Sequence, residues 1–428
     1  MRNVLSLGVS MMVAAGVVSL SPSGAEAQVG TASVSALGVA DSYGTLARGY
    51  AAPGANPALL GLDGNPFFSL AIPTVRASQG LSPISLSDLN RYSGQYIPTE
   101  QKLAWLDEID RIGSFQGGGQ AQASALALNV GPVAFQHSTY AVLDAHLNPD
   151  AAELLLFGNS GRSGSARDFV LDGSQLDASA FSSFALALGM PVSLTDSRQI
   201  AVGATLSYTV GHGVLAARDM GSMVQSDPVS VDLEFPVLHT GEDAGLSQGS
   251  GIGMDVGIAL DTERYSLSFA AKNVFNTFEW DTESMEYRPG EALFDGSEGT
   301  SDFDPQPADA APSELLAALA DQGFDPVLQL SGSYRLDTGT TLVAETRSRL
   351  GDGIAVTPKF HLGVGAEHEL ARWFAVRTGL AAITDGYRLG GGGTFILGPV
   401  NVTGGWLYQG GDVGAGHHLG FGLSFNQR

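Results

Sequence analysis

Apolar residues recur at every second position over much of the chain. The pattern is clearest at 200–210, 252–260, 265–271 and 360–366, where apolar side chains alternate with small, polar or charged ones. Such alternation is typical of a β-strand with one apolar face. A transmembrane barrel and a soluble sandwich both produce it, so alternation alone leaves both fold classes open.

Strand-like segments follow one another along the whole chain. Two of them, 229–238 and 283–294, contain Pro236 and Pro289, and proline removes a hydrogen-bond donor that a closed barrel needs. Without these two, the short turns fall on one side and the long insertions on the other, as in outer-membrane barrels. The sequence therefore predicts an all-β fold, a transmembrane antiparallel barrel of about fourteen strands, with sixteen as the alternative. The fourteen segments are 66–76, 120–130, 132–146, 179–191, 199–211, 250–261, 264–275, 326–336, 340–350, 358–369, 373–383, 386–397, 399–409 and 416–425.

The predicted organisation has three parts. Residues 1–27 form a signal peptide, 28–65 an N-terminal plug or hatch segment, and 66–428 the barrel. The long insertions are expected on the extracellular side, with short helices in them, and they span 77–119, 147–178, 212–249 and 276–325.

The N-terminus predicts export. Arg2 is followed by an apolar stretch from 4 to about 20, and then by Ala25-Glu26-Ala27, an A-x-A site with cleavage after Ala27. A membrane anchor is the less favoured alternative, because serines interrupt the short apolar stretch. Beyond Gln28 no apolar run approaches the ~18 residues that a spanning helix needs, which leaves a soluble exported protein or a barrel. The chain has no cysteine, which excludes disulfides and a lipid-anchored cysteine.

The C-terminus predicts a lipid-facing strand and an assembly signal. Leu419, Phe421, Leu423 and Phe425 share one face of a strand. The segment resembles the C-terminal signal of bacterial outer-membrane barrels through Gly420, Leu423 and Phe425, although three further residues follow it. The expected partners are outer-membrane lipid and the barrel assembly machinery. Aromatic residues that would form belts at the membrane surfaces lie near strand ends: Trp280, Trp373, Tyr387, Trp406 and Tyr408.

Charge narrows the choice of partners. The chain has 44 acidic and 21 basic residues and a net charge of −23, which makes nucleic acid an unfavourable partner.

Charged residues also fall on positions of the wall strands that would face the lumen, where they are expected to pair and hold the plug. A ring that selects ions is the less favoured interpretation. These lumen charges are Asp255, Lys272, Glu345, Arg347 and Arg377, together with Arg349, Glu367 and Arg388.

Residue patterns that carry catalysis are weak. The segment 161–164 lacks the spacing of a nucleophile elbow, and 390–393 does not lie between a strand and a helix as a phosphate loop does. His361 and His368 fall on opposite faces of one strand and cannot converge on a metal. We therefore predict no catalytic residues, no metal and no cofactor, and expect that the chain is not an enzyme.

Two regions resemble the FadL-like superfamily of outer-membrane barrels. The first is 37–41 with 51–60, in which Asn56-Pro57-Ala58 matches an element of the segment that plugs the lumen, although Leu59 replaces a frequent glycine. The second is 251–257 with 271–275, which is similar to a strand pair of PorV-type relatives. The resemblance implies a fourteen-stranded barrel with an internal hatch in which Asn56, Pro57 and Ala58 belong to the plug and ligand route. It implies passage of small hydrophobic or amphipathic molecules; the alternative is a non-transport scaffold or partner of a secretion or surface-attachment system.

Overall fold

A single closed wall of antiparallel strands organises the chain. The computed structural model describes residues 30–195, 197–241, 245–296, 298–320, 322–351, 358–411 and 415–427. The predicted signal peptide, 1–27, lies outside these residues. Each wall strand pairs with the next in antiparallel fashion, and the last, β23, pairs with β1 from Leu81↔Ala415 to Phe68↔Gln427. The strand pairing therefore closes the barrel without a free edge.

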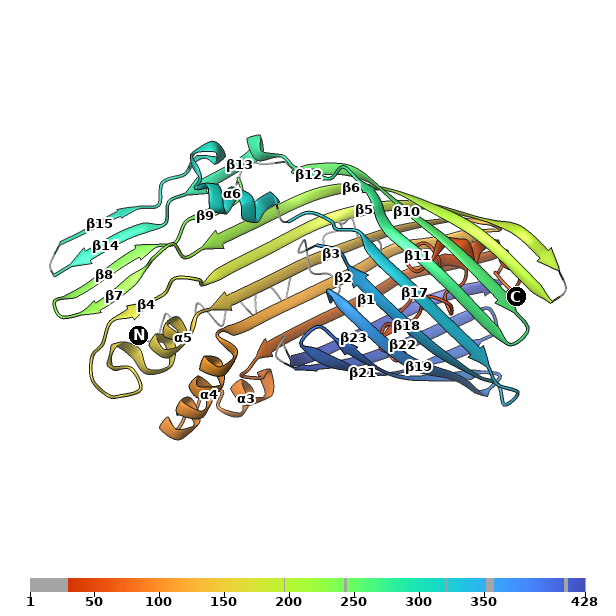
Figure 1. Cartoon of the computed structure of the whole chain (residues 1–428), viewed down its shortest axis with the longest axis horizontal. Coiled ribbons are helices and arrows are strands. Elements are labelled where there is room, and N and C mark those ends of the chain that lie inside the picture. Colours follow the sequence, from red (N-terminus) through yellow and green to blue (C-terminus); the bar gives the residue numbers. More distant parts are fainter. Residues whose placement is uncertain are drawn as a thin grey trace.

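Fourteen strands of the described chain form this wall, which confirms the prediction (Figure 1). They are β1 Phe68–Ser82, β2 Phe115–Val130, β3 Val133–Leu147, β5 Gln175–Thr195, β6 Arg198–Arg218, β10 Gly249–Thr262, β11 Tyr265–Asn276, β17 Val327–Arg335, β18 Thr340–Arg349, β19 Phe360–Ala371, β20 Phe374–Ile383, β21 Gly386–Leu397, β22 Val400–Gly411 and β23 Ala415–Gln427. Several strands are longer than predicted. The first insertion accordingly spans 83–114 rather than 77–119, because β1 and β2 continue to pair beyond the segments that alternate in hydrophobicity.

The two proline-containing segments lie outside the wall, as predicted, but they are not irregular loops. Pro236 separates β8 Val229–Glu234 from β9 Val237–Thr240, and Pro289 separates β13 Met285–Arg288 from β14 Glu291–Asp295. Each proline interrupts a ladder where its missing N–H would leave a pairing unmade. β9 pairs with β6 and with β13, and β13 also pairs with β16 Gln306–Pro307.

A second, five-stranded sheet extends beyond the wall at the left of Figure 1. Its order is β15-β14-β8-β7-β4. The strands not yet given are β4 Phe169–Val170, β7 Met223–Ser226 and β15 Glu298–Asp302.

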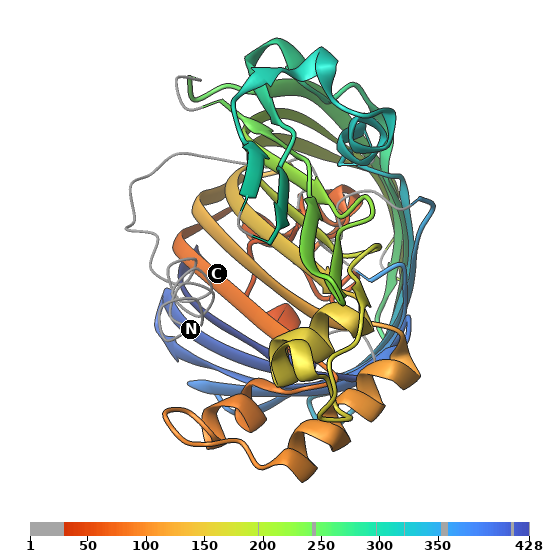
Figure 2. The ribbon, with the colours of Figure 1, turned by 90° about the vertical axis from the view of Figure 1, so that its left-hand side faces the viewer.

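The two ends of the barrel differ. At one end the wall strands join through short turns, such as those at 131–132, 263–264 and 398–399; we call it the short-turn end. The opposite, long-loop end carries the second sheet and the helices, which surround the opening seen in Figure 2. These elements are α3 Leu86–Arg91, α4 Thr99–Ile112, α5 Pro149–Phe157, α6 Ser313–Ala320, β12 Glu279–Trp280 and the 3-10 turns η3 Gly158–Ser160, η4 Thr282–Ser284 and η5 Ala308–Ala310.

The two faces of the wall have opposite character. Outward side chains such as Leu206, Ile258 and Phe421 are apolar and exposed, whereas Thr205 and Ser207, the strand neighbours of Leu206, are buried on the lumen side. This is the arrangement that a strand between lipid and a polar lumen requires. None of the helices in the described part of the chain is long and apolar enough to cross a membrane.

Residues 30–66 fold inside the barrel as the hatch. The hatch contains α2 Ser35–Gly38, η1 Gly49–Ala51 and η2 Pro57–Gly61, and most of its residues are buried. Its apolar side chains are mostly small, and they pack against small wall residues such as Ala134, Ala187, Ala201 and Ala259. Small residues on both sides let the hatch backbone lie directly against the wall.

Candidate functional site

Asn56 anchors the second half of the hatch. Its side chain is fully buried, and Nδ2 donates to the carbonyls of Ile258 at 3.3 Å and Phe269 at 3.0 Å, which are paired residues of β10 and β11. Oδ1 accepts from the Ala58 amide at 2.9 Å and so caps η2, whose first residue is Pro57. The Asn56 amide therefore makes three hydrogen bonds, two from Nδ2 to the wall and one to Oδ1 from the hatch itself.

Glycines in the wall make this contact possible. A Cβ placed on Gly257 would lie 2.0 Å from Asn56 Oδ1, and a Cβ on Gly203 would lie 2.4 Å from the Ala58 amide nitrogen. Any larger residue at either position would push the Asn56-Pro57-Ala58 element away from the wall. The predicted plug residues thus lie in a depression of the wall at Gly203 and Gly257, which we call the seat and which only glycine at these positions allows.

Asp41 anchors the first half of the hatch, and sequence analysis did not select it. Its carboxylate binds Arg76 of β1 at 2.6 Å and Arg388 of β21 at 2.9 Å, while its carbonyl accepts from Arg347 of β18 at 2.9 Å. Ala40 and Asp41 both have positive φ, 51° and 64°, so the backbone turns sharply to present these acceptors. One hatch residue thereby joins three strands that lie far apart in the sequence.

Glu345 forms a third anchor next to Asp41. Its Oε2 accepts from the Gly44 amide at 2.8 Å, from Gln329 at 3.0 Å and from Ser331 at 2.9 Å, and the carboxylate pairs with Arg347 at 3.1 Å. The carbonyl of Gly44 is bound as well as its amide, because Ser268 Oγ donates to it at 2.9 Å. Glu345 and Arg347 were predicted as lumen charges, and the structure brings them together at the hatch.

The remaining predicted lumen charges serve separate positions. Lys272 donates to the Gly54 carbonyl of the hatch at 2.5 Å, and Asp255 accepts from the Asn273 amide at 2.8 Å. Arg377 binds Glu367 at 2.5 Å, away from the other anchors. Arg349 is also buried, at the end of β18. The charges do not form one ring around the lumen; most of them bind a partner on the hatch or a neighbouring strand.

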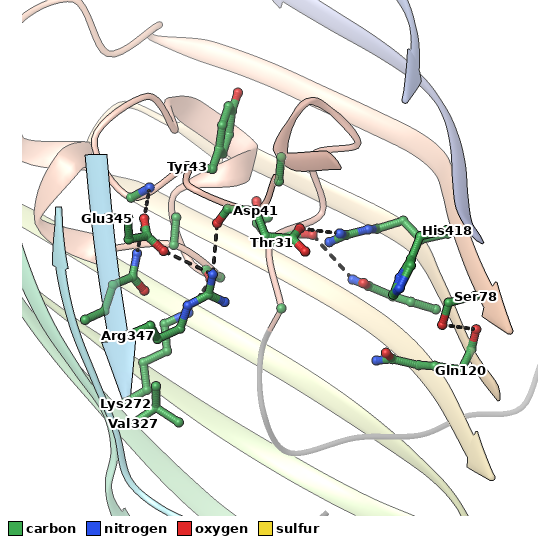
Figure 3. Close-up of a pocket in the computed structure, with 18 of the residues that line it drawn as sticks. Thr31, Asp41, Tyr43, Ser78, Gln120, Lys272, Val327, Glu345, Arg347 and His418 are labelled. Carbon is green, nitrogen blue, oxygen red and sulfur yellow. Dashed lines mark hydrogen bonds and ion pairs between the residues drawn. The ribbon is translucent and has the colours of Figure 1, made fainter. Parts of the chain in front are cut away.

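Two polar cavities lie against the hatch. The outer cavity, about 90 Å³, is bordered by Ser78, Gln120 and Val327 in the half of the wall near the long-loop end. Figure 3 shows Asp41, Glu345 and Arg347 converging on one side of it and Ser78 with Gln120 on the other. The inner cavity, about 120 Å³, is bordered by strand residues next to the short turns, among them Asn401 and Asn426. Neither is the apolar pocket that a permanently open route for hydrophobic molecules would need.

An aromatic cluster lies at the long-loop end of the lumen. The rings of Phe181 and Phe278 both contact Phe324, with centroids 5.1 and 5.0 Å apart, and Trp280 packs edge-on against both of them. Tyr140 and Phe181 are almost completely buried. The cluster is held in place because Trp280 Nε1 donates to the Gln322 carbonyl at 2.7 Å.

The position of Trp280 corrects its assignment to a membrane belt. In β11 and β12, Phe275 points outward, and residues 276, 278 and 280 therefore point to the lumen. This parity was available in the sequence. By contrast, Trp373, Tyr387 and Trp406 are exposed on the wall, Trp373 beside a short turn and the other two in its long-loop half, as a pair of belts requires; Tyr408 is partly buried beside Tyr387.

The predicted assembly signal is divided between the two faces of β23. Leu423 is exposed on the outer face, and Phe425 is partly buried with its ring edge-on to Phe68 at 6.0 Å. Gly420 faces inward, where a Cβ would lie 2.8 Å from Leu37 of the hatch. The glycine of the signal therefore also permits the hatch to seat.

Comparisons with known proteins find similarity in structure only. No family model matches the chain, and no curated protein matches it. Among solved structures, a FadL homologue of Pseudomonas aeruginosa is similar over 95% of this chain and 100% of its own, at 12% identity and a TM-score of 0.47. The toluene transporter TbuX of Ralstonia pickettii covers 94% and 99% at 12% identity and a TM-score of 0.46. The toluene transporter TodX of Pseudomonas putida covers 95% and 99% at 10% identity and a TM-score of 0.44.

Proposed function

We propose that this chain is an outer-membrane barrel that passes small hydrophobic or amphipathic molecules. The observation that carries the proposal is a closed wall with an apolar exterior, whose lumen contains a separate hatch held by discrete polar anchors. The toluene transporters TbuX and TodX are similar to this chain over most of its length, and we carry the class of their solute, a small apolar molecule, over to this chain as part of the proposal.

The aromatic cluster supplies the first apolar surface along such a route. Its partly exposed members Phe278, Trp280 and Phe324 lie on the lumen side at the long-loop end, where a solute arriving from outside would meet them, and aromatic side chains bind apolar molecules mainly by burying their surface. Beyond the cluster the described cavities are polar, and Asn56-Pro57 lies sealed against the wall. Passage of an apolar molecule therefore requires the hatch to move.

The test compares the wild-type chain with a deletion of residues 28–60. After equal membrane insertion is shown by heat-modifiable migration on a gel, uptake of a labelled fatty acid and of toluene is measured together with single-channel conductance. We expect the deletion to raise conductance and to change uptake of the apolar probes. Equal and negligible uptake and conductance in both proteins would reject gated transport.

A pair of point variants tests the entry surface without removing the hatch. Phe324→Ala should change uptake of the apolar probes, because Phe324 joins the other rings of the cluster. Trp406→Ala is the matched control, since Trp406 is an aromatic residue on the outer face of the wall. The same effect from both variants would show that the cluster has no special role.

A non-transport scaffold is the second candidate, and the second sheet favours it. β4, β7, β8, β14 and β15 project beyond the wall and contribute nothing to the lumen (Figure 1). A secretion or surface-attachment partner could bind this sheet through its edge strands β15 and β4. Under this proposal, removal of the β14–β15 hairpin abolishes partner binding and leaves uptake unchanged. Loss of uptake after the same removal would instead connect the sheet with transport.

A further inference from the structure

The outer and inner cavities meet at a single hatch side chain. Among the described residues, Tyr43 is the one that borders both. The outer cavity reaches Tyr43 from the long-loop half of the wall, and the inner cavity reaches it from the half that carries the short turns. Figure 3 shows Tyr43 on the hatch at the edge of the outer cavity, beside Asp41. We propose that the hatch closes a hydrated pathway for small anions and that Tyr43 is its gate.

The size and polarity of the two cavities fit water rather than an apolar solute. Their volumes are about 90 and 120 Å³, and most of the residues that border each cavity have polar side chains. Volumes of this order accommodate several water molecules, each of which occupies ~30 Å³ in the liquid. Together the cavities extend over both halves of the lumen, and the phenol ring of Tyr43 lies between them.

The backbone around Tyr43 is fixed independently of its side chain. The Ser42 hydroxyl bonds His361 at 3.2 Å, the Gly44 amide donates to Glu345 at 2.8 Å, and Ser268 donates to the Gly44 carbonyl at 2.9 Å. By contrast, the phenol oxygen of Tyr43 accepts a long hydrogen bond, which Ser33 Oγ donates at 3.4 Å. Truncation of the ring should therefore connect the cavities while the hatch stays docked.

The charges that border the cavities favour anions. Cationic side chains are Arg76, Arg347, Arg388 and Lys272 around the outer cavity and Arg48 and Arg377 around the inner one, whereas the acidic residues that border them are Asp41 and Glu345. Arg377 is paired with Glu367, so Arg48 supplies the main positive charge of the inner cavity. Arg48 donates to the carbonyls of Thr45 and Ala47, which are neutral acceptors and leave its positive charge in place beside the inner cavity. Rings of arginine and lysine select anions in pores. This positive lining contrasts with the net charge of −23 of the whole chain.

The proposal goes beyond the transport of apolar molecules, because the solute is hydrated and charged and passes without displacement of the hatch. The apolar route and the anion pathway can also be distinguished by experiment. Uptake of a labelled fatty acid tests the apolar route, whereas ion conductance through a docked hatch tests this one. Failure of the uptake assay leaves the anion pathway unaffected, and the reverse is equally true.

The experiment measures single-channel conductance in planar bilayers and the reversal potential under a KCl gradient. Wild type, Tyr43→Ala, Tyr43→Phe and the matched control Tyr50→Ala are compared after heat-modifiability shows that all four fold. Tyr50 is also a tyrosine of the hatch, but it borders only the inner cavity and not the outer one. We expect Tyr43→Ala to raise conductance severalfold with a reversal potential of the sign for chloride, and Tyr43→Phe and Tyr50→Ala to behave like wild type.

A further substitution tests the origin of the selectivity. In the Tyr43→Ala background, Arg48→Gln should shift the reversal potential toward zero while conductance persists. The gate is refuted if Tyr43→Ala conducts like wild type or if Tyr50→Ala opens the barrel equally, which would indicate general loosening of the hatch. A reversal potential of the sign for potassium in Tyr43→Ala would refute the anion preference.

Discussion

Replacement of Asp41 by alanine should release the first half of the hatch. The substitution removes the carboxylate that pairs with Arg76 and Arg388 and leaves both guanidinium groups in the lumen without it. The side chains are 12% exposed for Asp41, 19% for Arg76 and 8% for Arg388, so solvent compensates them only in part. Loss of one member of a buried ion pair costs about 3–5 kcal/mol, and the water-accessible cavity beside these groups places the value near the lower end.

The corresponding change in docking is large enough to measure. A cost of about 3 kcal/mol multiplies the undocked fraction of the hatch roughly a hundredfold, since each ~1.4 kcal/mol is a factor of ten. Hydrogen exchange of the backbone amides in 35–44 should accelerate by that factor in the solubilised protein. Amides of the wall strands should be unaffected, because their ladder does not depend on Asp41.

Two further variants make the reasoning refutable. Asp63→Ala is the matched control within the hatch, because Asp63 is exposed and bonds Gln199 at the surface, where the loss is about 1 kcal/mol or less. Arg388→Met added to Asp41→Ala removes one stranded charge and should restore part of the protection. Unchanged exchange in Asp41→Ala, or an equal effect of Asp63→Ala, would contradict the assignment of Asp41 as an anchor.

Three other substitutions probe the seat, the wall and the loops. Asn56→Asp keeps the shape of the side chain but turns an oxygen toward two wall carbonyls; exchange in 55–61 should rise sharply, and unchanged exchange would count against the seat. Phe425→Asp should lower outer-membrane yield, at a cost of up to about 2–4 kcal/mol depending on depth in the membrane, and normal yield would argue against its assembly role. Burial alone would raise the pKa of Glu153, but hydrogen bonds from Arg162 and Arg167 lower it below its ordinary value. Protease resistance of 158–168 should therefore be full above that value, near 4.5, and be lost as the pH falls through the lowered pKa, whereas Glu153→Gln should remove this pH dependence.

The sequence predicts the wall well because each wall residue faces one of two very different environments. Leu206 faces lipid and Thr205 faces the lumen, and their hydrophobicity differs accordingly. The alternation therefore indicates both that the segment is a strand and which of its faces points outward. Pro236 and Pro289 then exclude two segments from a closed ladder. The predicted strand ends are less accurate. Where strands continue to pair outside the membrane, their outward residues need not be apolar, so the alternation that marks a strand is lost.

The site is less predictable because its contacts join distant segments. Asn56 is recognisable from its short motif and its place before the first strand, but Asp41 gains its role from three arginines on β1, β18 and β21, whose registers the sequence does not specify. Its local signals are its place in the segment 37–41, which resembles the FadL-like N-terminal region, and its acidic side chain after the small and apolar residues at 36–40. Tyr43 gives no signal at all, because its importance depends on the cavities at either side.

The way in which the hatch is held bears on both proposed routes. Apolar packing is non-directional and would hold a plug in many positions. Hydrogen bonds and ion pairs instead fix the hatch in one position, and they are lost together when the hatch leaves that position. Here the wall presents glycines where the hatch touches it most closely, as at Gly203 and Gly257, and polar anchors around them. Backbone lying on glycine buries little apolar surface, so the anchors contribute a large share of the docking free energy. A hatch held in this way has one well-defined closed position and can leave it after the loss of a few bonds, while a polar gap beside it can conduct ions without any such movement.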